Sequence, residues 1–249
     1  MNQPKRLLGV LGGLGPMSTV YFCELLTSHT RATCDADHID MLISSRASTP
    51  DRTAFILGKS DLDPLPVMQE EAQRLVNAGA DLLVIPCNTA HYFYNGLQTS
   101  CRVPILNIIR ETVEQLHRSG VKRFGLLATE GTIRSGAYKQ VCEQLGLMCE
   151  TPTDAEQAVI SSIIFDDIKQ NRTVDLDAFL RVAEAMRQRG CERLVLGCTE
   201  LSLLKKKLTD DSIYLDSLEV LAYRTIVAFG KQPIGFSKEF DSLEQGADK

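Results

Sequence analysis

Two cysteines stand at the ends of two similar apolar segments. The first segment reads VIPCNTAH over residues 84–91, and the second reads VLGCTEL over residues 195–201. A continuous apolar run that stops at polar residues is typical of a buried parallel strand ending at the edge of its sheet. A single buried cysteine usually has a packing role alone. The repeated setting favours a chemical role for Cys87 and Cys198 as a pair.

Two thiols on opposite sides of one carbon atom can invert the configuration at that carbon. One thiol removes a proton from one face, and the other returns a proton to the opposite face, whereas a single base would restore the original configuration. One cysteine must then be a thiolate while the other is a thiol. We expect helix N-termini and neighbouring hydroxyl donors to favour this state by lowering a cysteine pKa from about 8.5.

The two cysteines belong to a faint internal repeat. The glycine, acidic residue, valine and cysteine at 79, 81, 84 and 87 recur with the same spacing at 190, 192, 195 and 198. The opening segment GVLGGLG at 9–15 also resembles GLLATEG at 125–131. We therefore predict two pseudo-symmetric halves that face each other across an interdomain cleft.

Short apolar runs alternate with amphipathic helical patterns along the chain. Strands are predicted at 6–12, 38–45, 81–86, 103–109, 121–128, 147–151, 193–197 and 212–216. Helices are predicted from Pro16 onward and at 63–79, 111–119, 135–146, 155–170, 175–189 and 217–229. This alternation indicates the α/β class with parallel sheets covered on both faces. The predicted domains are 1–110 plus 209–230, then 111–208, followed by a C-terminal tail at 231–249.

Composition excludes several classes of function. The chain has 249 residues, 44% of them hydrophobic, and a net charge of −5, which argues against a nucleic-acid binder because such proteins usually carry a basic face. No apolar run is long enough to span a membrane and no signal peptide is evident, so we expect a cytoplasmic protein without a membrane partner. The eight cysteines form no C-x-x-C pair and the histidines are scattered. We therefore expect neither a metal nor another cofactor.

Four motifs in order resemble the aspartate/glutamate racemase superfamily, most closely its aspartate racemase branch. They are GGLGP, TPDRT, PCNTAH and GCTEL, and the resemblance extends to about residue 230. It implies two flavodoxin-like domains, a homodimer, and racemisation of an amino acid without a cofactor. It also implies that Cys87 and Cys198 are the catalytic acid and base.

The resemblance also implies which residues bind the substrate. Arg52 matches an arginine that holds a substrate carboxylate, for which its planar fork is suited. Lys169 matches a substrate-binding lysine near the rim of the cleft. The remaining substrate-binding candidates follow the strand ends in both halves: Asn88, Thr89, Ala90, Thr129, Thr132, Thr199 and Glu200.

Three alternatives remain open at this stage. A nucleotide-binding oxidoreductase would need G-x-G-x-x-G after the first strand, but Pro16, Met17 and Ser18 follow Gly15. A non-catalytic binding protein could share the arginine clamp but has no use for paired thiols. Hydantoin racemases and maleate isomerases use related paired cysteines, and Arg52 is the reason to favour an acidic amino acid, aspartate before glutamate.

Overall fold

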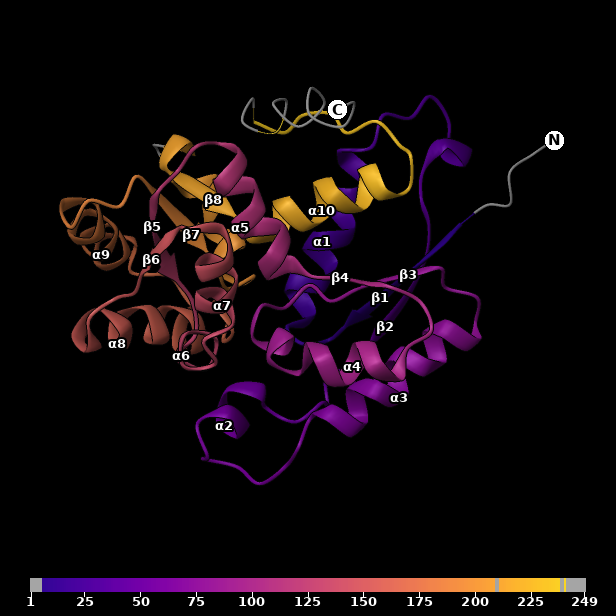
Figure 1. Cartoon of the computed structure of the whole chain (residues 1–249), viewed down its shortest axis with the longest axis horizontal. Coiled ribbons are helices and arrows are strands. Elements are labelled where there is room, and N and C mark those ends of the chain that lie inside the picture. Colours follow the sequence, from indigo (N-terminus) through magenta and orange to yellow (C-terminus); the bar gives the residue numbers. More distant parts are fainter. Residues whose placement is uncertain (1–5, 209–210, 238–239, 241–249) are drawn as a thin grey trace.

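Two four-stranded parallel sheets form the framework of the protein (Figure 1). The computed structural model describes residues 6–208, 211–237 and 240. The strand orders are β2-β1-β3-β4 and β6-β5-β7-β8, so the two sheets have the same connectivity. The strands are β1 (Leu7–Gly12), β2 (Asp40–Ser45), β3 (Leu82–Val84), β4 (Ile105–Leu106), β5 (Arg123–Leu127), β6 (Met148–Glu150), β7 (Arg193–Leu196) and β8 (Tyr214–Asp216). The predicted α/β class and the two similar halves are confirmed.

Helices pack around the two sheets. They are α1 (Pro16–Ser28), α2 (Arg52–Ile56), α3 (Leu65–Asn77), α4 (Tyr94–Ser100), α5 (Ile108–Arg118), α6 (Glu130–Arg134), α7 (Ala137–Leu145), α8 (Asp154–Ser162), α9 (Leu176–Gln188) and α10 (Ser217–Ala228). After α8 the chain continues into a π-helical turn, Ile163–Ile168, which accounts for the long helix predicted there. The short helices α2, α4 and α6 were not predicted.

The residues of the internal repeat have equivalent structural roles. Gly79 and Gly190 end the helices before β3 and β7 with φ values of 101° and 89°, a left-handed conformation that favours glycine. Asp81 then accepts a hydrogen bond from the backbone at the start of β1, and Glu192 accepts one at the start of β5. Each acidic side chain thus ties the third strand of its half to the first.

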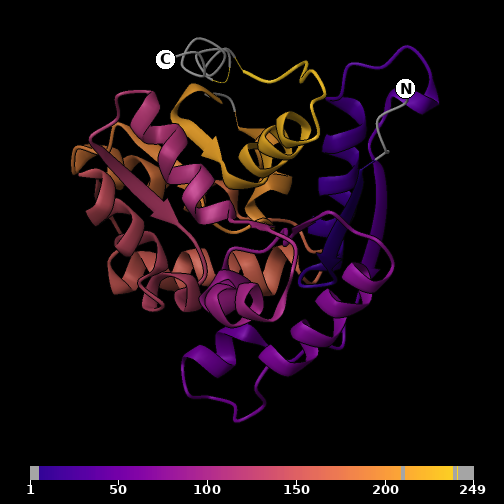
Figure 2. The same cartoon turned by 45° about the vertical axis from the view of Figure 1, so that its right-hand side comes forward.

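The segment after residue 208 is shared between the halves. The domain prediction placed 209–230 with the first half, but β8 pairs with β7 in the second sheet. Helix α10 then packs against both α1 and α5 (Figures 1 and 2). Its Arg224 forms an ion pair with Glu111 of α5, with 2.6 Å between Nε and Oε2. Helix α5 in turn packs against α7, so helices from both halves meet in one layer.

The predicted C-terminal tail is described in part. Residues 231–237 run past the end of α1, where Thr30 forms an antiparallel bridge with Pro233. Positions 238–239 and 241–249 lie outside the described residues. Among the described residues, no helix combines the length and the apolar character that crossing a membrane requires.

Candidate active site

Cys87 and Cys198 line the same buried cavity between the two halves. Each follows the third strand of its half, β3 or β7, at the carboxyl end of a parallel sheet, where ligands of α/β proteins bind. The cavity is lined by Leu14, Asp51, Arg52, Thr53, Cys87, Asn88, Thr89, Thr129, Lys169, Cys198, Thr199 and Glu200. The two strand ends therefore face one cavity, as the repeat predicts. Of the predicted site residues, Ala90 and Thr132 lie outside this lining.

The cavity is closed in this conformation. Its free space is about 10 Å³, roughly the room that one water molecule needs. Helix α2 of the first half covers it by packing against α6 of the second half. At that contact a side chain on Gly131 would approach Thr53 within 3.0 Å, so the glycine permits the close fit. An amino acid does not fit into this free space unless residues of the lining move.

The residue that contacts the backbone of Cys87, His91, has a structural role. Its carbonyl oxygen contacts Nδ1 of His91 at 2.8 Å, and Nε2 of the same imidazole accepts from the backbone N–H of Ile108 at 3.3 Å. His91 thus joins the end of β3 to the start of α5, and its burial lowers its pKa to about 4. Burial also raises the pKa of the Cys87 thiol, while the charge of Arg52 acts in the opposite direction.

The surroundings of Cys198 include a carboxylate. Sγ of Cys198 donates a hydrogen bond to Oε2 of Glu200 at 3.0 Å. Burial, followed by the charge of Glu200, raises the pKa of the Cys198 thiol well above its ordinary value. The expected lowering of the cysteine pKa is therefore wrong for both thiols in the closed cavity. The helical turns that follow them, Thr89–Phe93 and Leu201–Lys207, are of the 3-10 type, and burial outweighs their influence.

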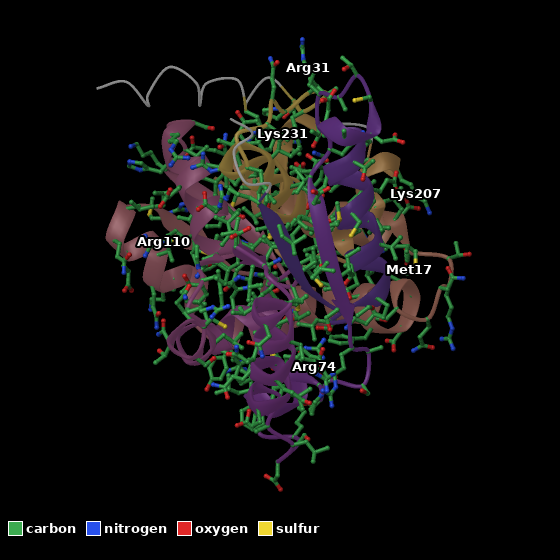
Figure 3. The ribbon with its side chains drawn as sticks, turned by 90° about the vertical axis from the view of Figure 1, so that its right-hand side faces the viewer. Met17, Arg31, Arg74, Arg110, Lys207 and Lys231 are labelled. Carbon is green, nitrogen blue, oxygen red and sulfur yellow. The ribbon has the colours of Figure 1, made fainter. Side chains whose placement is uncertain are left out.

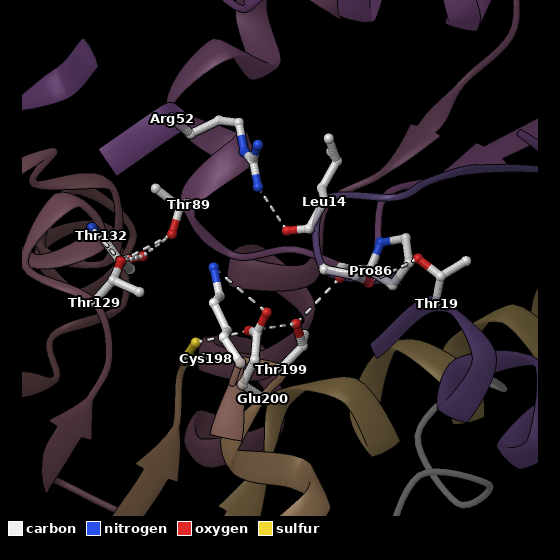
Figure 4. A network of polar contacts seen from close by, with 12 residues as sticks. Leu14, Thr19, Arg52, Pro86, Thr89, Thr129, Thr132, Cys198, Thr199 and Glu200 are labelled. Atoms are coloured by element: carbon white, nitrogen blue, oxygen red, sulfur yellow. Dashed lines mark hydrogen bonds and ion pairs between the residues drawn. The ribbon is translucent and has the colours of Figure 1, made fainter. Parts of the chain in front are cut away.

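Arg52 lies at the cavity wall with its guanidinium group held by backbone carbonyls. Nη2 donates to the carbonyl of Leu14 at 2.8 Å (Figure 4). Nη1 donates to the carbonyl of Pro50 at 3.0 Å. Its buried Nε has no hydrogen-bond partner within the described part of the chain, nor does the guanidinium form an ion pair there. The arginine is thus a fixed cation whose charge no carboxylate balances.

Lys169 also lines the cavity, directly after the π-helical turn. Its Nζ lies 3.7 Å from Oε1 of Glu200 and 4.8 Å from the centre of the Phe165 ring. The side chain remains one-third exposed. Lys169 and Arg52 therefore bring two cations to the cavity from opposite halves.

Three threonine hydroxyls join the two halves beside the thiols. Oγ1 of Thr89 in the first half lies 2.9 Å from the hydroxyls of Thr129 and Thr132 in the second half (Figure 4). Thr129 also caps α6 by accepting from the backbone N–H of Thr132. All three side chains are buried, so their mutual hydrogen bonds satisfy groups that would otherwise be costly to bury.

Asn88 and Thr199 contribute further bonds between the halves. Asn88 donates to Ser217 at 2.9 Å and accepts from the hydroxyl of Tyr138 at 2.7 Å. Thr199 donates to the carbonyl of Pro86 at 3.3 Å, next to Cys87 (Figure 4). Tyr138 and Ser217 were not predicted as site residues, because helix patterns indicate burial but not the partner of a polar atom. His91 belongs to the first cysteine motif, but its support of Cys87 was not predicted.

Within the described residues, no group of three or more His, Cys, Asp or Glu side chains is arranged to hold a metal ion. The ionisable groups that line the cavity are two thiols, two cations and the carboxylates of Asp51 and Glu200. Such a set suits proton transfer at a carbon atom whose neighbouring carboxylate is bound by the cations.

The protein thus has two parallel α/β halves with a cysteine at equivalent strand ends. The model of the Asp/Glu/hydantoin racemase family matches residues 11–225. The chain belongs to this family of cofactor-independent amino-acid racemases.

Known members of the family differ in their substrates. The chain is 27% identical to a broad-specificity amino-acid racemase of Bacillus subtilis over 90% of its own length and 98% of the relative's. It is also 27% identical to glutamate racemase of Aquifex aeolicus, over 75% of this chain and 74% of that protein. The structure of Picrophilus torridus aspartate racemase superposes with a TM-score of 0.83 at 28% identity, covering 96% of this chain and 99% of the other.

Proposed function

We propose that this protein racemises an acidic amino acid, aspartate in the first place, by proton transfer between Cα and two cysteine thiols. The observation that carries the proposal is the placement of Cys87 and Cys198 at equivalent strand ends on one cavity. A thiolate on one side accepts the Cα proton, and the thiol on the other side donates a proton to the opposite face. No other co-reactant is required, because the electron pair left on Cα is protonated directly.

The cations of the cavity support an acidic substrate. Arg52 has a fixed guanidinium fork, and Lys169 brings a second positive charge from the other half. Aspartate carries two carboxylates, so one can bind each cation while Cα lies between the thiols. The likeness to the Picrophilus torridus aspartate racemase supports this choice, whereas glutamate is the second candidate.

A chiral assay of purified protein without added cofactor tests the proposal. We expect conversion of L-aspartate to D-aspartate and of D-aspartate to L-aspartate, and loss of both activities in Cys87→Ser and Cys198→Ser. The matched control is Cys101→Ser, because Cys101 is also buried but does not line the cavity. A neutral amino acid as the preferred substrate would refute the acidic specificity, and full activity in either active-site variant would refute the mechanism.

We also propose that the protein is a homodimer. Helix α1 and edge strand β2 expose Met17, Val20, Leu42 and Ile43, with 62%, 60%, 36% and 48% of their surfaces accessible. Met17 is labelled on the face shown in Figure 3. An apolar patch over an edge strand is typical of a surface that pairs with another chain. Light scattering should give the mass of a dimer, and Ile43→Lys should shift it toward the monomer; a monomeric wild type would refute this assignment.

A further inference from the structure

The Glu200 carboxylate requires a proton on the neighbouring thiol. Oε2 of Glu200 accepts a hydrogen bond from Sγ of Cys198 at 3.0 Å and lies 3.4 Å from Oγ1 of Thr199. A carboxylate can only accept hydrogen bonds, so the contact with Cys198 exists while that cysteine is a thiol. If Cys198 lost its proton, two anions would face each other in a buried site, where water cannot screen their repulsion.

The Glu200 carboxylate lies between the two halves. The side chain is buried, and its Oε1 lies against Gly15, where an added methyl group would collide with it. The same oxygen lies 3.7 Å from Nζ of Lys169 and has no hydrogen-bond partner among the described residues. The backbone of the first half and a lysine of the second are thus its neighbours, while the other oxygen contacts Cys198.

The two thiols differ in their charged neighbours. The ionisable groups that line the cavity with them are Asp51, Arg52, Lys169 and Glu200. Asp51 is occupied as the N-cap of α2, since Oδ1 accepts the backbone N–H of Ala54. Among the charged residues, Arg52 has the largest effect on the pKa of Cys87, which it lowers. Glu200 has the largest effect on the pKa of Cys198, which it raises. Burial opposes the anion at both cysteines, and the charged neighbours oppose it less at Cys87 than at Cys198.

Building on the proposed racemase function, we propose that Glu200 is a positioning residue that keeps the proton on Cys198, so that the reactive form of the free enzyme has its thiolate at Cys87. With this form, the Cα–H bond of one enantiomer breaks and an S–H bond forms on Cys87. The S–H bond of Cys198 breaks, and its proton forms the new Cα–H bond on the opposite face.

Turnover leaves a thiol at Cys87 and a thiolate at Cys198 beside the Glu200 carboxylate. The enzyme returns to its favoured form when Cys87 releases a proton to water and Cys198 takes one from water. One enantiomer therefore meets the favoured form of the enzyme, and the other enantiomer meets the less populated form.

Alkylation of the two thiols tests this proposal without a racemase assay. The labelling rate of each cysteine by iodoacetamide follows its thiolate fraction and can be measured by mass spectrometry of the separate peptides across a pH series. We expect Cys87 to be labelled faster than Cys198 in the wild type. In Glu200→Gln, which preserves size but removes the charge, labelling of Cys198 should rise by about tenfold or more, equivalent to one pKa unit. Labelling of Cys87, whose pKa the Glu200 charge also raises, should increase by a smaller factor because no hydrogen bond joins it to Glu200.

Glu156→Gln is the matched control, because Glu156 is a partly buried carboxylate that pairs with Arg189 outside the cavity. It should leave both labelling rates unchanged. Faster labelling of Cys198 than of Cys87 in the wild type would overturn the proposal, and this comparison does not depend on any variant folding. An unchanged Cys198 rate in folded Glu200→Gln would overturn it as well. Failure to racemise aspartate would refute the proposed substrate but would not alter these rates.

Discussion

Replacing Arg52 by lysine should weaken substrate binding while the positive charge is kept. The guanidinium is fixed by hydrogen bonds to the carbonyls of Leu14 and Pro50, at 2.8 and 3.0 Å. A lysine ammonium cannot reproduce this arrangement and also present a planar pair of donors to a carboxylate. Arg52→Lys should therefore lose one charge-assisted hydrogen bond to the substrate.

A charge-assisted hydrogen bond contributes about 1.5–3 kcal/mol. Its loss corresponds to a decrease of about 10- to 100-fold in kcat/KM, since each 1.4 kcal/mol is about tenfold. Most of the change should be in KM, because the carboxylate is bound equally in the ground state and the transition state. Initial rates with L-aspartate measure both constants. Arg74→Lys is the control, because Arg74 is exposed on α3 and pairs with Glu70 and Glu71. A kcat/KM of Arg52→Lys within twofold of the wild type would remove Arg52 from the binding site.

Two further perturbations test the support around the cavity. Burial lowers the pKa of His91 from 6.5 to about 4. As the pH falls, the imidazole is therefore protonated in the unfolded chain before it is protonated in the folded protein. The resulting contribution to the free energy of unfolding, about 3 kcal/mol by linkage, is present above pH 6.5 and is lost toward pH 4. Urea denaturation should show a shallower decline over this range in His91→Gln; equal declines would contradict the assignment. Gly131→Ala should push Thr53 of α2 outward and change KM at least threefold, whereas Gly96→Ala, which meets the flexible Leu65 side chain, should not. Equal KM values in both variants would show that the contact between α2 and α6 has no role in binding.

The strand-end thiols could be predicted because a local pattern encodes them. Continuous apolar segments identified β3 and β7, and the repeated glycine and acidic residue before each strand marked them as equivalent. The helix predicted at 63–79 corresponds to α3, in which Met68, Ala72, Leu75 and Val76 are buried at helical spacing. Such patterns survive in one sequence because each depends on residues a few positions apart.

The short helices and the contacts between halves could not be predicted in the same way. Helices α2 and α6 each span about one turn, so neither shows a hydrophobic period, and each depends on a single cap, Asp51 or Thr129. The raised pKa values of the thiols follow from burial by the opposite half, which no local pattern records. Helix α10 is buried on several sides, and its sequence therefore indicates burial without identifying α1 and α5 as its partners.

Deuterium incorporation during the first turnovers tests the central claim most directly. If Cys87 and Cys198 act on opposite faces of Cα, racemisation of L-aspartate in D2O should give D-aspartate that carries deuterium at Cα. The remaining L-aspartate should stay largely protonated over the same period, because its proton leaves to one thiol and the new one comes from the other. Equal deuterium in both enantiomers from the first turnovers would show that one base serves both faces, and would contradict the paired-thiol mechanism.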